Sequence, residues 1–188
     1  MAIVGKTRTK RRATVKDLHR VKGKAELVNG RIVHILPTGS RPGRVSLNIV
    51  FSLRVYEQAT RSGKAYPDNV AFLAHLPRRG SFSPDASYYT GQLPDDPDDF
   101  LPGPPDFAAE VRSKGDYGRA AEKKLRAKRA DYFDSGTKIV WDVDPVKQTV
   151  AVYRGDDPLH ATVYKAGQIA EAEPAVPGWR MPVNDIFA

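Results

Sequence analysis

Apolar positions along the chain follow two rhythms. From Val45 to Ala59, and again from Asp116 to Asp134, they recur near helical spacing, so each stretch predicts a helix. Shorter apolar runs predict strands, at residues 25–28, 31–35, 64–75, 82–89, 107–111, 139–143, 149–153 and 160–164. The order of hairpin, helix, strands, helix and strands indicates an α/β or α+β fold, with a sheet of about six or more strands flanked by helices.

Turn-forming residues divide these segments. Asn29-Gly30 lies between two apolar runs and predicts a type I′ hairpin turn, because both central positions need a positive φ. Residues 37–43 are rich in glycine and proline and predict a loop, and residues 78–81 predict a turn. Gly63 is the expected left-handed residue after the first long helix.

Two acidic residues fall inside predicted strands. Glu110 interrupts the apolar run from Phe107 to Val111, and Asp85 follows Pro84 within the strand region 82–89. An unpaired buried charge costs several kcal/mol, so Glu110 needs a metal, a lysine or an arginine as a partner. If the two strands pair, the carboxylates can share Mg²⁺ or Mn²⁺, which prefer oxygen ligands.

Cationic residues near these acids are candidates for the same site. Arg112 lies two positions after Glu110 and therefore faces the same side of the strand. It stays protonated, so it can hold a phosphate but cannot act as a general base. Lys124, Lys128 and Tyr132 stand four apart on one stripe of the second helix, so either lysine can serve the site.

A purely structural interpretation stands beside the metal site. Asp85 after Pro84 is also typical of a turn. Glu110 can equally form a structural ion pair with Arg112 or Lys128, and lysines on an amphipathic helix usually face solvent.

Charge and composition narrow the partners. The 188 residues include 30 Lys+Arg against 22 Asp+Glu, a net charge of +8 that favours nucleic acid as a partner. Residues 1–13 are basic without apolar periodicity and predict a disordered arm before a single domain at 14–188. The lack of cysteine excludes disulfides and thiol catalysis and fits a cytoplasmic location. We expect neither a membrane span nor a signal peptide, because no long apolar run exists.

Several of these segments together resemble the Uma2 family, a branch of the PD-(D/E)XK endonuclease-like superfamily. The resemblance covers roughly residues 14–187. It is carried by residues 25–31, Ser83-Pro84-Asp85, residues 105–113, 128–132 and 136–145, and Pro177-Gly178-Trp179. The chain departs from the family pattern at two places: Arg44-Val45-Ser46 stands where a histidine is often found, and Lys114 stands where proline is usual.

The resemblance implies a restriction-endonuclease-like core, a mixed sheet flanked by helices. It implies that Asp85 and Glu110 bind Mg²⁺ or Mn²⁺, with the carbonyl of Val111 as a third ligand. It also implies Lys128 as the lysine of the site and Glu26 as an accessory acid.

Three functions fit these expectations. The first is a Mg²⁺-dependent endonuclease that hydrolyses phosphodiester bonds in DNA. The second is a non-catalytic nucleic-acid-binding or interaction protein that retains the nuclease fold, and the third is a metal-dependent phosphodiesterase acting on another substrate. The sequence leaves a homodimer open.

Overall fold

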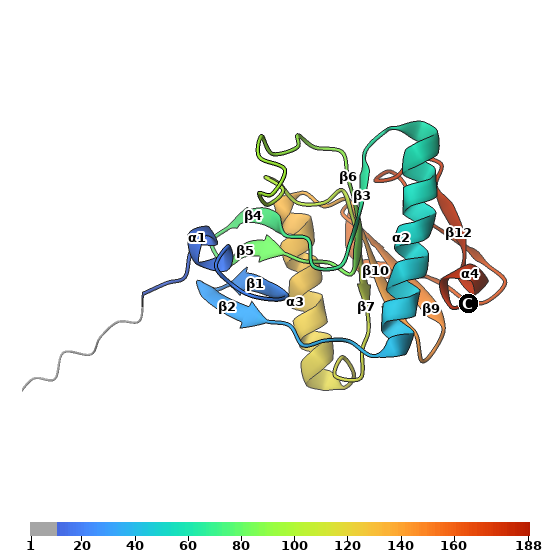
Figure 1. Ribbon diagram of the computed structural model, residues 1–188. Helices are drawn as coiled ribbons and strands as arrows, with labels where there is room; N and C mark the ends of the chain where they lie inside the picture. The colour runs from blue at the N-terminus through green and yellow to red at the C-terminus, as the bar shows by residue number, and fades with distance from the viewer. Residues whose placement is uncertain (1–10) are drawn as a thin grey trace, which may run out of the picture.

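The computed structural model describes residues 11–188 (Figure 1). Its elements in chain order are α1 (Val15–Leu18), β1 (Ala25–Val28), β2 (Arg31–His34), α2 (Ser40–Thr60), β3 (Lys64–Pro67), β4 (Phe72–Leu76), β5 (Arg79–Phe82), β6 (Ala86–Tyr89), β7 (Phe107–Val111), α3 (Arg119–Ser135), β8 (Ile139–Asp144), β9 (Thr149–Arg154), β10 (Asp157–Tyr164), β11 (Ile169–Glu171), β12 (Arg180–Pro182) and α4 (Val183–Ile186). Among these residues no helix is both long and apolar enough to span a bilayer.

The central sheet has six strands in the order β10-β9-β8-β7-β6-β3. The neighbours β7 and β8 are parallel and the other pairs are antiparallel. The parallel pair needs a crossover, and α3 supplies it on one face of the sheet. The expected mixed sheet flanked by helices is therefore confirmed.

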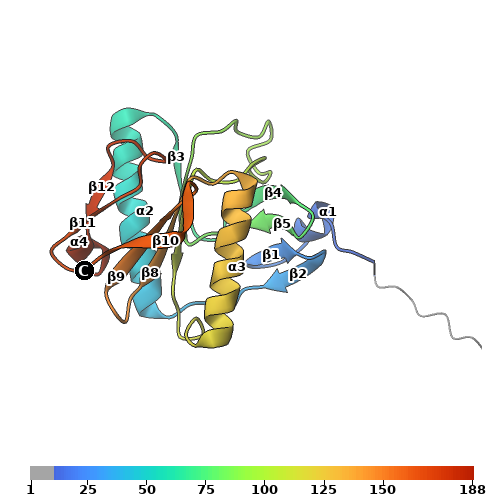
Figure 2. The ribbon, with the colours of Figure 1, turned by 180° about the vertical axis from the view of Figure 1, so that it is seen from behind.

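The elements are stacked in layers that both ribbon views show (Figures 1 and 2). One face of the central sheet is covered by α2 and the small β11-β12 sheet with α4. The other face is covered by α3, and beyond α3 lies a second sheet in the order β2-β1-β5-β4. Helix α3 thus lies between the two larger sheets.

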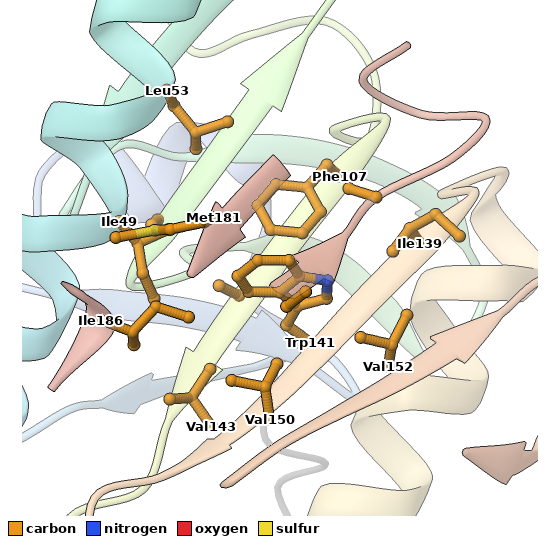
Figure 3. Close-up of a cluster of buried hydrophobic side chains, with 14 of the residues drawn as sticks. Ile49, Leu53, Phe107, Ile139, Trp141, Val143, Val150, Val152, Met181 and Ile186 are labelled. Atoms are coloured by element: carbon orange, nitrogen blue, oxygen red, sulfur yellow. The ribbon is translucent and has the colours of Figure 1, made fainter. Parts of the chain in front are cut away.

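Side-chain alternation along β7 assigns each residue to one of these layers. Phe107, Ala109 and Val111 join the core under α2, whereas Ala108 belongs to the cluster on the α3 side. Glu110 therefore faces α3. On the α2 side, Figure 3 shows Trp141 of β8 packed among apolar side chains from the sheet, α2 and the C-terminal segment. The face of the central sheet under α2 therefore holds the large apolar core, and the face towards α3 holds polar side chains such as Glu110.

The turn chemistry of the first hairpin is confirmed, because Asn29 and Gly30 have φ values of 50° and 68°. The loop expected at 37–43 is wrong in its second half, since α2 begins at Ser40. Pro42 fits in the first turn because a helix uses no backbone donor there.

The end of α2 also differs from expectation. Arg61, and not Gly63, adopts the left-handed conformation, with φ 54°. Gly63 is needed for another reason: a Cβ there would lie 2.6 Å from the Tyr88 ring and 2.7 Å from the Tyr89 carbonyl oxygen. Helix α3 begins at Arg119, three residues later than predicted.

The region from residue 78 to residue 89 is the main correction. The expected turn at 78–81 is largely strand β5, and the expected single strand at 82–89 is interrupted. Strand β5 belongs to the four-stranded sheet and β6 to the six-stranded sheet, and Ser83-Pro84-Asp85 connects them. Proline cannot donate to a strand ladder, which suits a break at this point. Asp85 consequently lies at the junction of two sheets.

The C-terminal segment forms the β11-β12 pair and α4, which apolar patterning did not predict. Trp179 stacks on Trp141 with ring centroids 5.0 Å apart, and Ile186 is fully buried, so the C-terminal segment joins the core. At the other end, residues 1–10 of the predicted arm lie outside the described residues. Arg11 forms an ion pair with Asp17, 2.7 Å apart, so the described end of the arm contacts the domain.

Asp144, at the end of β8, provides a test of the fold. Its buried carboxylate accepts hydrogen bonds from the Tyr117 hydroxyl (2.9 Å) and from the amides of Val146 (2.9 Å) and Lys147 (3.0 Å). Burial alone would raise the pKa of Asp144, but these hydrogen bonds outweigh burial and hold it below its usual value. The carboxylate therefore stabilises the fold above the unfolded-state pKa of about 3.9 and loses this effect as pH falls further.

We expect Asp144→Ala to lower the free energy of unfolding by about 1–3 kcal/mol at pH 7. Urea titrations of both proteins between pH 7 and pH 3 would measure it, with exposed Asp156→Ala as the control. The difference from wild type should narrow below about pH 4. A difference that stays constant with pH would contradict the role given to the ionised carboxylate.

Candidate active site

Glu110 meets two donors from α3. The ammonium of Lys128 lies 2.8 Å from its carboxylate, and the Tyr132 hydroxyl donates to Oε1 at 2.6 Å. Lys128 and Tyr132 are one helical turn apart, so both point from the same stripe towards β7. Stacking of the Tyr132 ring on Phe82 at 4.0 Å fixes the hydroxyl in place.

Glu26 reaches the same lysine from the second sheet. Its Oε1 lies 2.8 Å from Lys128 Nζ and accepts a 3.0 Å hydrogen bond from the Ser83 amide. Its Oε2 accepts from the Arg79 guanidinium at 2.8 Å. Lys128 therefore bridges carboxylates from two sheets.

Asp85 approaches from the junction between β5 and β6. Its amide donates to the Ala109 carbonyl at 3.1 Å, and its carbonyl accepts from Ser46 Oγ of α2 at 2.6 Å. Its Oδ2 accepts from the Val111 amide at 2.8 Å, so the carboxylate lies against the residue that follows Glu110. The two acids predicted from sequence are thus brought to the same part of β7.

Burial and neighbouring charges set the protonation of this cluster. Burial raises the pKa of Glu110, and Asp85 and Glu26 raise it further, against the opposing effect of Lys128. For Glu26, burial is outweighed by Lys128 and Arg79, which lower its pKa. The acids in turn hold the pKa of Lys128 above its usual value despite burial, so it remains an ammonium.

Tyr132 also keeps its proton. Burial raises its pKa well above the usual value, and the charge of Glu110 adds to the effect. At neutral pH the α3 stripe therefore presents two hydrogen-bond donors to Glu110, and neither serves as a general base. Lys128 acts in this cluster through its positive charge.

Two accessory candidates lie apart from this cluster. The guanidinium of Arg112 makes a bidentate pair with Asp142 at 2.7 and 2.8 Å and also pairs with Glu122. The alternative of a Glu110–Arg112 pair is therefore wrong, and the guanidinium expected to hold phosphate is occupied by acids. Lys124 is exposed and forms no ion pair within residues 11–188, so Lys128 is the lysine of this stripe that meets Glu110.

Lys24 belongs to the site and was missed from the sequence. Its ammonium lies 2.8 Å from Asp85 Oδ1 and 2.5 Å from Asp68 Oδ1. The signal available was its position two residues before Glu26 and directly before β1, since alternate residues of an extended chain share a face. Ser46, which binds the Asp85 carbonyl, carried no such signal.

The donor set suits a hard divalent cation. Asp85 and Glu110 offer carboxylate oxygens, and the Val111 carbonyl is the expected third ligand. Within residues 11–188 no group of three or more acidic, histidine or cysteine side chains is arranged to hold an ion. Mg²⁺ commonly binds through one or two carboxylates and keeps several waters or substrate phosphates, so Asp85 and Glu110 are the carboxylates that could hold it.

Comparisons with known proteins support a nuclease-like fold. The model of a family described as "Uma2: Putative restriction endonuclease" matches residues 15–184. A crystal structure from Anabaena variabilis ATCC 29413, described as "a putative nuclease belonging to DUF820", superposes with a TM-score of 0.73. It is 18% identical, and the match covers 93% of this chain and 97% of that one. No curated protein matches the chain.

Removing the Lys128 charge should destabilise the domain. Lys128→Met leaves Glu26 and Glu110 without their shared cation, and breaking a buried pair in this way costs about 3–5 kcal/mol. Lys124→Met removes the same charge one turn earlier on an exposed face and should change stability by less than about 0.5 kcal/mol. Urea unfolding at pH 7.5 with a chelator present measures both. Equal effects would contradict the bridging role of Lys128.

Proposed function

The chain belongs to the Uma2 family, and from this premise we propose that it is a Mg²⁺-dependent endonuclease that hydrolyses phosphodiester bonds in DNA. The observation that carries the proposal is the convergence of Asp85 and Glu110 with Lys128. These residues come from a sheet junction, a strand and a helix; Asp85 accepts from the Val111 amide next to Glu110, and Lys128 pairs with Glu110.

In this proposal Asp85, Glu110 and the Val111 carbonyl hold the metal ion. When bound, Mg²⁺ supplies Lewis-acid polarisation of the phosphate and a more acidic bound water. Lys128 keeps its positive charge beside Glu110 and stabilises the negative charge that develops on the phosphate. Tyr132 orients Glu110 by donating a hydrogen bond to it, and Glu26 orients Lys128 through their ion pair.

Nucleic acid is the substrate class that the charge favours. The net charge of +8 attracts a polyanion. The proposal of DNA rests on this charge together with the family. The rival proposal, a binding protein without catalysis, is supported by the ion pairs themselves, because Lys24 and Lys128 compensate the acids without a metal.

Neutralising either proposed metal ligand should remove cleavage. Asp85→Asn and Glu110→Gln should each lower Mg²⁺-dependent cleavage by about 10²-fold or more, the loss seen when one strong electrostatic stabiliser is removed. Asp156→Asn, an exposed acid in the turn before β10, is the matched control and should behave as wild type. Circular dichroism confirms that each variant folds.

The substrates for this assay are plasmid DNA, single-stranded RNA and bis-p-nitrophenyl phosphate, each with Mg²⁺ and with a chelator. Cleavage of DNA alone supports the proposal. Cleavage of the small diester without nucleic acid favours a phosphodiesterase of other specificity. Metal-dependent binding of DNA without turnover by the wild type would favour the non-catalytic alternative.

The basic arm gives a separate prediction. Deleting residues 1–10 removes Lys6, Arg8 and Lys10 and should weaken DNA binding. The slope of log affinity against log salt should fall by about 0.9 for each phosphate that these residues neutralise. Turnover at saturating DNA should persist, because the proposed ligands all lie after residue 80. An unchanged salt slope, measured by fluorescence anisotropy, would show that the arm does not bind phosphate.

A further inference from the structure

Lys24 makes a contact that the proposed chemistry does not use. Its side chain is only 15% exposed, and its ammonium is held between Asp68 and Asp85. Burial would lower the pKa of Lys24, but Asp85 and Asp68 outweigh burial and raise it, so the group is charged. It is a fixed cation on an acid proposed to bind a metal.

Both oxygens of Asp85 are already occupied. Oδ2 accepts from the Val111 amide at 2.8 Å, and Oδ1 lies 2.8 Å from Lys24 Nζ. Metal–oxygen bonds to carboxylates are about 2.0–2.6 Å long, so an ion bound through Oδ1 would compete with the ammonium for the same oxygen. Two cations on one partly buried oxygen repel each other strongly.

Asp68 offers the displaced ammonium a second partner. It lies between β3 and β4 and its side chain is 45% exposed, against 23% for Asp85. A shift of Lys24 from Asp85 towards Asp68 therefore moves the ammonium to the more solvent-exposed of its two partners. Because Asp68 already forms an ion pair with Lys24, the ammonium keeps an existing partner when it leaves Asp85.

We propose that Lys24 occupies the cation position at Asp85 until a divalent metal displaces it, and that Asp68 then holds the ammonium in a more exposed position, where it binds a substrate phosphate. This inference rests on the proposed function and adds a substrate-binding residue to it. It makes Lys24 a competitor of the metal in the free protein and a partner of the nucleic acid in the complex.

Mn²⁺ titration without nucleic acid tests the competition. Isothermal titration calorimetry on the full chain would compare wild type with Lys24→Met, Lys24→Arg, Lys22→Met and the double variant Lys24→Met/Asp85→Asn. Lys24→Met should bind Mn²⁺ at least about tenfold more tightly, because it removes a charge in direct contact with the ligand oxygen. Lys24→Arg retains the charge and should stay near wild type.

Lys22→Met is the matched control, since it removes an equal charge from an exposed position two residues away. It should leave Mn²⁺ affinity within about twofold of wild type, as surface charges are screened by solvent and salt. Asp85→Asn should abolish the tight binding in the Lys24→Met background, which places the ion at this carboxylate. Equal Mn²⁺ affinity in wild type and Lys24→Met would overturn the inference.

DNA binding and cleavage kinetics test the phosphate contact of Lys24 separately from its competition with the metal ion. With Ca²⁺ present and cleavage suppressed, Lys24→Met should bind a DNA duplex more weakly than Lys22→Met does, and in cleavage assays its KM should rise more than its kcat falls. Unchanged DNA affinity would overturn the phosphate contact.

The outcomes also distinguish this inference from the proposed function. Tighter Mn²⁺ binding by Lys24→Met without any cleavage would support the inference and contradict the nuclease. Cleavage by proteins in which wild type and Lys24→Met bind Mn²⁺ equally well would support the nuclease and contradict the inference about Lys24. If neither protein binds Mn²⁺, both proposals fail.

Discussion

Carboxylates buried on the α3 face of the central sheet need cations, and the rest of the site depends on how this need is met. Ion pairs form two runs in which acids and bases alternate. One run joins Asp68, Lys24 and Asp85, and the other joins Glu110, Lys128, Glu26, Arg79 and Asp131. The runs meet at β7, where Asp85 accepts from the amide of Val111, the residue after Glu110. An unpaired buried member would cost several kcal/mol, so the pairs made by Lys128 and Asp131 fix α3 between the two sheets.

This arrangement requires the chain to leave one sheet and enter the other at Ser83-Pro84-Asp85. The Ser83 amide binds Glu26 of the second sheet, while the Asp85 amide binds Ala109 of the central sheet. The Asp85 carbonyl is held by Ser46 of α2, on the opposite side of the sheet from α3. Asp85 is therefore positioned by three layers at once, which explains how a residue at a break between strands can hold a defined orientation.

Much of this could be predicted from local patterns. Glu110 in an apolar run required a partner, and the four-residue spacing of Lys128 and Tyr132 placed both on one helical stripe. The division of residues 78–89 between two sheets could not be predicted, because apolar patterning does not show that β5 pairs with β1 and β4 while β6 pairs with β3 and β7. Arg112 was assigned to Glu110 by strand alternation, yet the parallel neighbour β8 presents Asp142 directly opposite Glu110, and Asp142 binds the guanidinium. Lys24 was missed since its partners lie about 44 and 61 residues away, beyond any helical or strand period.

Charge balance in the cluster has a consequence for metal binding. Three cations, those of Lys24, Lys128 and Arg79, contact five carboxylates, those of Asp68, Asp85, Glu110, Glu26 and Asp131. The two metal-free runs together therefore carry more negative than positive charge, and a divalent ion would offset this excess. A phosphate diester would bind to that ion, so each of the two makes binding of the other more favourable. Because such coupling is reciprocal, the factor by which nucleic acid tightens metal binding equals the factor by which the metal tightens binding of nucleic acid.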